Sequence, residues 1–281
     1  MFFCNGQVAT TAQLAALGRI NYGHFTTLPI HYGAVKGWDY HVQRLRHATR
    51  VLFATELDCT SLQTQIQHGI DQTGLLTAHL RITICSLDHV AEPVQKPSID
   101  SFLHFSPIVQ RPATSLAVCS QCHQRMLPEI KHVATFSSYY YQRRARAAGF
   151  DDVLFTTDKG LVAEGAFWNI GFWDGERIIW PEAAILAGTG QMLIAKGLRA
   201  LNVPTTMRPI HIADIPHFRA AFMCNALGHR SIRAIDDHPL LGEDLLPMLD
   251  QALAQTSWQP MDRLEPRSKR HSSAPMSACG E

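Results

Sequence analysis

The strongest constraint on the fold is a hydrophobic period that changes repeatedly along the chain, because strands repeat every two residues and helices about every 3.6. Strand-like runs alternate with amphipathic helical stretches in both halves of the sequence. Residues 110–114, QRPAT, show neither pattern and contain a proline, so we expect an interdomain linker there. The alternation predicts an α+β (mixed α/β) protein of two domains with a cleft between them.

Before the linker, the expected elements are a hairpin of strands 25–30 and 34–37 around a tight Tyr-Gly step, helices 39–53 and 61–72, and strands 79–87 and 101–109. After the linker, the patterns predict strands 116–120, 152–157, 160–165, 166–173, 177–180, 205–211 and 219–226, and helices 132–148, 189–201 and 243–255. We therefore expect a small N-terminal α/β domain over 1–109, a larger C-terminal domain over 115–258, and a disordered tail over 259–281.

Composition excludes several classes of protein. A hydrophobic fraction of 46% is too high for a disordered chain, and a net charge of +1 gives no reason to expect a nucleic-acid partner. The sequence shows neither a secretory leader nor an apolar run of about 18 residues, so no membrane partner is expected. The seven scattered cysteines are then expected to be reduced thiols in a cytoplasmic protein.

One cysteine-containing string, residues 119–123 (CSQCH), matches the attachment motif of a c-type haem. That attachment requires export, and a zinc site would need further ligands at matched spacing. We interpret the string as the end of a strand that carries two thiols, and we expect no metal site.

Lysine is scarce in this sequence, with six residues in all, so a search for a reactive amine is short. Lys131 differs from the others because it lies in the apolar stretch PEIKHVATF, just before a predicted helix. Burial of an ammonium group favours its neutral form, and a neutral amine can form an imine with an aldehyde. The same stretch also suits a lysine whose aliphatic stem packs while its head reaches water.

Glu164 is the second candidate, because it lies at the end of a predicted strand and precedes an aromatic-rich one in LVAEGAFWNIGFW. Asn169 follows among Trp168, Ile170 and Phe172. Such a setting is unusual for a surface acid. It also suits two polar side chains that satisfy backbone groups at a strand bend.

Two further segments suit an anion. Gly188, Thr189 and Gly190 lie where a loop opens into a helix, and free N–H groups at a helix start can bind a phosphate. Arg44 lies near the apolar face of the helix 39–53, and its planar fork suits the same ligand. A plain helix cap and a solvated arginine are the alternative interpretations.

Six segments in this order make the sequence resemble the class IV aminotransferases, the fold type IV pyridoxal phosphate enzymes. The segments are NYGHFTT (21–27), HVQRL (41–45), EIKHV (129–133), GLVAEGAFWNI (160–170), ILAGTG (185–190) and CNAL (224–227). The resemblance covers most of the chain, and the 33-residue step from Lys131 to Glu164 is typical of the family. It implies the D-amino-acid aminotransferase-like fold, with pyridoxal 5'-phosphate (PLP) bound by the C-terminal domain.

The resemblance also implies roles for individual residues. Lys131 matches the lysine that forms a Schiff base with the cofactor and then shuttles a proton, and Glu164 matches the acid that faces the pyridine nitrogen. The phosphate-binding positions of the family fall on Arg44, Thr189 and Gly190, and the turn that contacts phosphate and substrate carboxylate falls on Asn225 and Ala226. Substrate-facing positions fall on Arg81, Phe25 and His79.

The sequence departs from the family pattern at three places. Gly190 replaces the usual phosphate-binding threonine, Phe136 stands where branched-chain enzymes carry a tyrosine, and Arg230-Ser231-Ile232 replaces the usual acid-proline ending. These changes leave cofactor binding expected and the substrate open.

The resemblance implies a PLP-dependent aminotransferase that moves an amino group between an amino acid or amine and a 2-oxo acid. The turn Cys224–Leu227 is closer to aminodeoxychorismate lyase, which releases pyruvate, so a lyase is the first alternative. A non-catalytic binding protein on the same fold is the second. The family also implies a homodimer.

Overall fold

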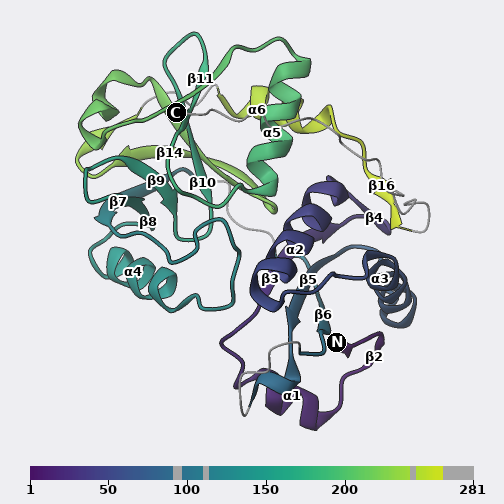
Figure 1. Cartoon of the computed structure of the whole chain (residues 1–281). Helices are drawn as coiled ribbons and strands as arrows, with labels where there is room; N and C mark the ends of the chain where they lie inside the picture. Colours follow the sequence, from purple (N-terminus) through teal and green to yellow (C-terminus); the bar gives the residue numbers. More distant parts are fainter. Residues whose placement is uncertain (91–96, 110–113, 241–244, 262–281) are drawn as a thin grey trace, which may run out of the picture.

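The computed structural model describes residues 1–90, 97–109, 114–240 and 245–261, and these form two large sheets, each with its own helices, and one two-stranded sheet (Figure 1). The linker expected at 110–114 therefore lies outside the described residues except for Thr114, as do the tail beyond residue 261 and the first two residues of the helix expected at 243–255.

The N-terminal sheet is antiparallel, with the order β2-β1-β6-β5-β3 in the described residues. Its strands are β1 (Phe2–Cys4), β2 (Gln7–Val8), β3 (His24–Ile30), β5 (Ala78–Cys85) and β6 (Asp100–Ser106). The helices of this part are α1 (Thr11–Leu17), α2 (Trp38–Phe53), α3 (Cys59–Thr73) and the short 3-10 helix η1 (Leu87–Val90). The apolar stripes of α2 and α3 bury Leu45, Phe53, Leu62 and Ile66 in one core with strand residues such as Leu80.

The C-terminal sheet is larger and mixed, with the order β12-β11-β10-β13-β14-β7-β8-β9 and with β15 beside β14 in the described residues. Its strands are β7 (Leu116–Cys122), β8 (Asp152–Thr156), β9 (Val162–Gly165), β10 (Asn169–Trp173), β11 (Ile178–Pro181), β12 (Thr205–Arg208), β13 (Ala220–Asn225), β14 (Gly228–Ile235) and β15 (His238–Pro239). Its helices are α4 (Phe136–Ala147), α5 (Thr189–Ala200), the 3-10 helix η2 (Ile212–His217) and α6 (Leu245–Ala254). The mixed α/β class expected from the sequence is confirmed.

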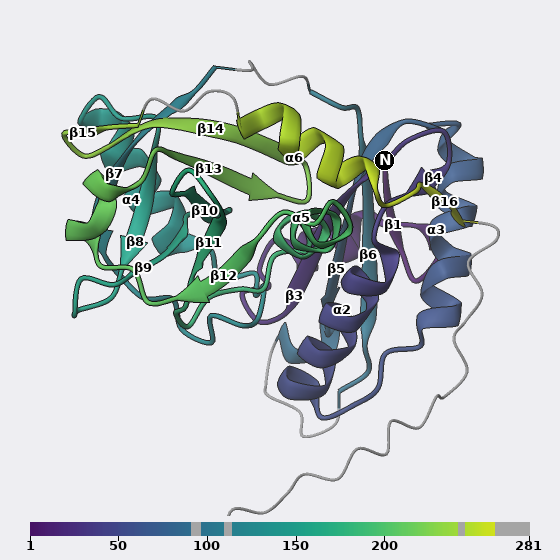
Figure 2. The ribbon, with the colours of Figure 1, turned by 90° about the horizontal axis from the view of Figure 1, so that it is seen from above.

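Helix α5 lies between the two sheets and next to α2, as Figures 1 and 2 both show. The approach is close because residue 37, directly before α2, is a glycine with φ +67°. A Cβ at Gly37 would lie 2.9 Å from Leu193 Cδ2 of α5. This contact places the start of α5 beside the N-terminal part of the molecule.

The segment that carries Lys131 is a loop, and α4 begins at Phe136 rather than at residue 132 as expected. The Phe25 N–H donates to the Lys131 carbonyl over 2.9 Å, and the Val133 N–H donates to the Gly23 carbonyl over 2.9 Å. These backbone groups pair with the start of β3 and are not available to a helix. Lys131 is thereby fixed against the N-terminal sheet.

The expected hairpin at 25–37 is wrong in its pairing. Tyr32 and Gly33 do form a tight turn, with both hydrogen bonds between His31 and Ala34. However, β3 pairs with β5, and the short strand β4 (Ala34–Val35) pairs with β16 (Gln259–Pro260). The tail expected from residue 259 is therefore wrong for residues 259–261, because Gln259 and Pro260 form a strand and Met261 is 1% exposed in the N-terminal core.

Other differences concern strand ends. The strand expected at 166–173 begins at Asn169, because the Gly165 N–H donates to the Trp168 carbonyl and closes a turn over 166–168. Strands β1, β2 and β14 and helix α1 were not expected from the sequence, since these stretches are short or lack clear alternation.

No helix within the described ranges is long and apolar enough for a membrane crossing.

Candidate active site

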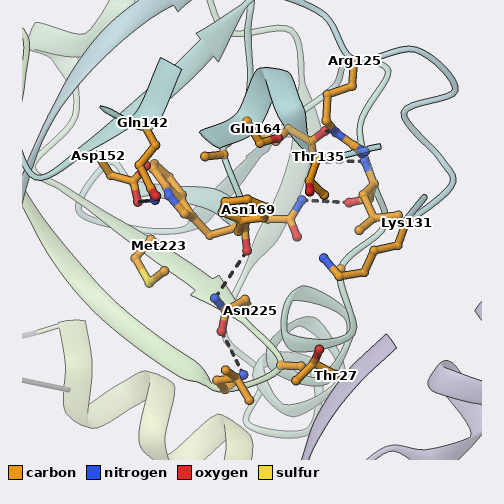
Figure 3. A pocket seen from close by; sticks show the side chains of 18 of the residues that line it. Thr27, Arg125, Lys131, Thr135, Gln142, Asp152, Glu164, Asn169, Met223 and Asn225 are labelled. Atoms are coloured by element: carbon orange, nitrogen blue, oxygen red, sulfur yellow. Dashed lines mark hydrogen bonds and ion pairs between the residues drawn. The ribbon is translucent and has the colours of Figure 1, made fainter. Parts of the chain in front are cut away.

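A cavity of about 560 Å³ lies where the two parts of the chain meet. Phe25, Arg44 and Arg81 line it from the N-terminal part, and Lys131 and Glu164 line it from the C-terminal part. Figure 3 shows Thr27, Lys131, Asn169 and Asn225 among the side chains that line this cavity. Residues that the sequence separates by more than a hundred positions thus face a single space.

Lys131 is half-buried, and its amine is largely removed from solvent. Its Nζ lies 4.9 Å from the centroid of the Phe25 ring, in contact with an apolar face. Burial, together with the positive charges of Arg44 and Arg125, lowers the pKa of Lys131 to about 7, although Glu164 acts in the opposite direction. A large share of this side chain is therefore the neutral, nucleophilic amine near neutral pH.

Glu164 is the buried acid of the cavity, at the end of β9. Its Oε1 accepts a hydrogen bond from Arg125 Nε over 2.8 Å, and its Oε2 accepts one from the Leu186 N–H over 3.2 Å. Burial raises the pKa of Glu164, and the charge of Arg125 opposes that rise. The carboxylate is held in one orientation at the cavity wall.

Arg125 was missed by the sequence analysis and connects the acid to the lysine. Besides the bond to Glu164, its Nη1 donates to the Ile130 carbonyl over 3.3 Å and its Nη2 donates to the Pro128 carbonyl. One guanidinium therefore ties Glu164 to the loop residues directly before Lys131. The sequence does contain an arginine six residues before Lys131. Nothing in that spacing indicates a contact with Glu164, because the contact forms only when the loop folds.

The start of α5 forms a polar corner of the cavity. Thr189 is 1% exposed, and its Oγ1 has no hydrogen-bond partner in the structure. A Cβ at Gly190 would collide with the Asn225 carbonyl, and a Cβ at Gly188 would collide with Asn169 Oδ1. Gly190 therefore lets the helix start approach the 225–226 turn closely, and Gly188 lets it approach Asn169. Gly188 and Thr189 line the cavity, whereas Gly190 lies behind them against Asn225.

Arg44 reaches the cavity from α2. Its Nη2 donates to Thr26 Oγ1, and its buried Nε has no partner. Burial lowers the pKa of Arg44 to about 10. A desolvated guanidinium with an unused donor is suited to an anionic ligand.

The turn between β13 and β14 closes the cavity on another side. Asn225 Oδ1 accepts from the Leu227 N–H over 2.9 Å, and Asn225 Nδ2 donates to the Phe167 carbonyl over 3.4 Å. Both Asn225 and Ala226 line the cavity. Asn169 holds the loop that leads into α5, because its Nδ2 donates to the Leu186 carbonyl over 2.8 Å.

Of the three residues predicted to face the substrate, two line the cavity and one does not. Arg81 and Phe25 line the cavity, with the Arg81 guanidinium carbon 3.6 Å from the centroid of the Phe25 ring. His79 lies on β5 two residues before Arg81, and it is not among the residues that line the cavity. The structure therefore does not bring His79 to the site, because the strand carries it beyond the cavity edge.

The charge of the cavity favours an anion, since basic side chains outnumber acidic ones in its lining. The basic residues are Arg44, Arg81, Arg125, Lys131, Arg146 and Arg230, and the acidic residues are Asp151, Asp152 and Glu164. In the part of the chain that the structure describes, no three side chains of His, Cys, Asp or Glu gather in a way that could hold a metal ion.

A desolvated lysine, a buried acid and an anion corner at a helix start together define a site for an anionic aldehyde cofactor. The chain belongs to the class IV aminotransferases, because the family model described as amino-transferase class IV matches residues 23–235. Among curated proteins, none matches this chain in sequence.

Solved structures share the fold. A hypothetical aminotransferase from Mycobacterium tuberculosis, in its PLP-bound form, superposes with a TM-score of 0.75 at 17% identity, over 91% of this chain and 99% of that chain. The branched-chain amino acid aminotransferase from Escherichia coli gives 0.77 at 16% identity, over 89% and 91%. The 4-amino-4-deoxychorismate lyase from Pseudomonas aeruginosa gives 0.70 at 22% identity, over 89% and 97%. The fold type IV architecture expected from the sequence is confirmed.

Proposed function

We propose that this chain is a PLP-dependent aminotransferase that moves an amino group between an amino acid or amine and a 2-oxo acid. The observation that carries the proposal is the desolvated Lys131 amine in one cavity with Glu164 and with the unpaired donors of Arg44 and Thr189. The proposal includes a homodimer with small amino acids and oxo acids as substrates, as is usual in the family.

The residues of the cavity fit PLP. The Thr189 hydroxyl and Arg44 Nε are buried and have no partner in the structure, and Gly188 and Thr189 at the helix start line the cavity, so a phosphate would find donors there. Bound PLP supplies an aldehyde carbon and a ring that accepts electrons. Lys131 would hold the aldehyde, and Arg44 and Thr189 would hold the phosphate.

The roles of the side chains follow from their environments. Neutral Lys131 is able to take a proton from the substrate Cα and return it to a neighbouring carbon, because its pKa of about 7 suits both steps near neutral pH. Glu164, held by Arg125 and the Leu186 N–H, would keep a proton on the ring nitrogen of the bound cofactor. The Asn225–Ala226 turn and Arg81 would orient the carboxylate of the substrate.

A lyase that releases pyruvate from aminodeoxychorismate is the second candidate. The turn Cys224–Leu227 favours it, since its sequence resembles that lyase more closely than the branched-chain enzymes. The turn lies at the cavity wall, where it would contact the substrate. The third candidate is a binding protein without catalysis. Such a protein would not need the neutral, nucleophilic amine that the lowered pKa gives Lys131.

Absorbance and product analysis separate the three candidates. Purified protein with added PLP should show the visible absorbance of the lysine-bound cofactor, and Lys131→Ala should abolish it. A panel of amino donors of both hands with 2-oxo acids should yield new amino acids. Pyruvate released from aminodeoxychorismate without an oxo acid would replace the transaminase assignment by the lyase, and a colourless protein would favour the binding protein.

A further inference from the structure

A buried chain of three side chains runs from the cavity into the N-terminal part of the molecule. Arg44 lines the cavity and donates through Nη2 to Thr26 Oγ1. The same oxygen lies 2.6 Å from His41 Nδ1. Thr26 is fully buried on β3 and His41 is buried on α2, so neither is placed to meet a ligand directly.

The local structure explains why the three meet. His41 and Arg44 are three residues apart and therefore lie on the same face of α2, one turn from each other. Thr26 projects from the strand beneath that face, between the two side chains. Arginine has only donors, so the Thr26 oxygen accepts from Arg44 and its own proton is left for His41 Nδ1.

Neither supporting side chain carries a charge that would compensate Arg44. Threonine is neutral, and burial, together with the nearby positive charges of Arg44 and Lys131, lowers the pKa of His41 well below its usual value, so the imidazole is neutral. Within the described residues no carboxylate forms an ion pair with Arg44. Arg125, in contrast, is paired with Glu164. Of these two cavity arginines, Arg125 has a carboxylate partner and Arg44 has an uncharged one.

We propose that Thr26, backed by His41, is a positioning residue that holds Arg44 through an uncharged contact, so that the full charge of the arginine is available to the phosphate group of the cofactor. The proposal rests on the proposed function in its choice of PLP as the anion. A carboxylate at position 26 would orient the arginine equally well and would weaken its attraction for a phosphate.

The experiment compares three ligands of cofactor-free protein: PLP, inorganic phosphate, and pyridoxal, which lacks the phosphate. Thr26→Val keeps the shape and removes the hydroxyl, and Thr26→Ser keeps the hydroxyl. We expect Thr26→Val to weaken PLP and inorganic phosphate about tenfold, the effect of one lost hydrogen bond to a charged group. We expect Thr26→Ser to stay within about threefold of the wild type, and pyridoxal affinity to be unchanged in both variants.

A general structural defect would weaken pyridoxal as much as PLP, and that outcome would overturn the proposal. Unchanged affinity of Thr26→Val for inorganic phosphate would overturn it as well. His41→Leu supplies a second route if Thr26→Val fails to fold, since it removes the support of the hydroxyl and should weaken PLP and phosphate, but not pyridoxal. The inorganic phosphate arm tests the positioning of Arg44 even if the protein has no aminotransferase activity.

Discussion

Arg125 and Glu164 form a buried ion pair in which Nε and Oε1 lie 2.8 Å apart, with side chains 11% and 9% exposed. The same guanidinium donates to the carbonyls of Pro128 and Ile130, directly before Lys131. Arg125 therefore fixes the position of Glu164 relative to the loop that carries Lys131, although it supplies neither the acid nor the amine.

Breaking this pair should be costly. Glu164→Leu leaves the largely buried charge of Arg125 without a counter-charge, and we expect the free energy of unfolding to fall by about 3 kcal/mol, as measured by chemical denaturation. Adding Arg125→Met to that variant removes the uncompensated positive charge and should restore most of the lost stability. The double variant should still fail to give the visible absorbance of the wild-type protein with PLP. Equal stability losses in the single and double variants would contradict this account.

The amine of Lys131 should titrate close to neutrality. Because only the neutral amine is nucleophilic and its pKa is about 7, the rate of its reaction with pyridoxal should rise about tenfold between about pH 6 and pH 8 and then level off. Lys131→Ala is the control and should remove the absorbance change at every pH. A rate that keeps rising towards about pH 10 would show that the amine titrates like an ordinary lysine.

Gly190 should not tolerate a side chain. In Gly190→Ala the new Cβ collides with the Asn225 carbonyl, which separates the helix start from the 225–226 turn, and we expect a stability loss of about 1–3 kcal/mol with weaker phosphate binding. Gly197→Ala is the matched control on the same helix, because its Cβ collides with the Ala252 carbonyl away from the cavity. It should lose stability and keep its affinity for inorganic phosphate. Titration calorimetry of both variants checks the distinction.

The segment from Trp258 to Met261 connects the region after α6 to the N-terminal part of the molecule. Strand β16 pairs with β4, and Lys36 Nζ donates to the Leu253 carbonyl over 3.0 Å and lies 5.1 Å from the centroid of the Trp258 ring. Deleting 258–281 should lower the free energy of unfolding by about 3 kcal/mol, since buried Met261 is lost with the strand.

The control for this deletion is a protein that ends after Met261. The sequence beyond that residue lacks apolar periodicity, so its removal should leave the unfolding temperature within about 2 °C of the full chain. A similar loss of stability in both truncated proteins would show that β16 is not the stabilising element.

Hydrophobic periodicity was enough to predict the long helices and strands, because each buries one face and the apolar residues of that face recur at regular spacing in its own sequence. Helix α2 and strand β5 were predicted within about two residues for this reason. Short or irregular elements were not predictable, since β4 pairs with residues more than two hundred positions away and nothing in its two residues indicates that partner. The helix expected from residue 132 begins at Phe136 instead, because backbone groups of residues 131 and 133 pair with the segment at the start of β3, and the local sequence does not show that pairing.

The sequence by itself determined the kinds of groups at the site and their order: one lysine in an apolar setting, an acid 33 residues later and a glycine-flanked helix start. Only the tertiary structure decided how each group is charged and held. It buries Lys131 beside two arginines, pairs Arg125 with Glu164, and leaves Arg44 with uncharged partners. The reason is physical: a residue type fixes which atoms can donate, accept or ionise, whereas desolvation and neighbouring charges, which set the pKa of those atoms, exist only once distant segments pack together.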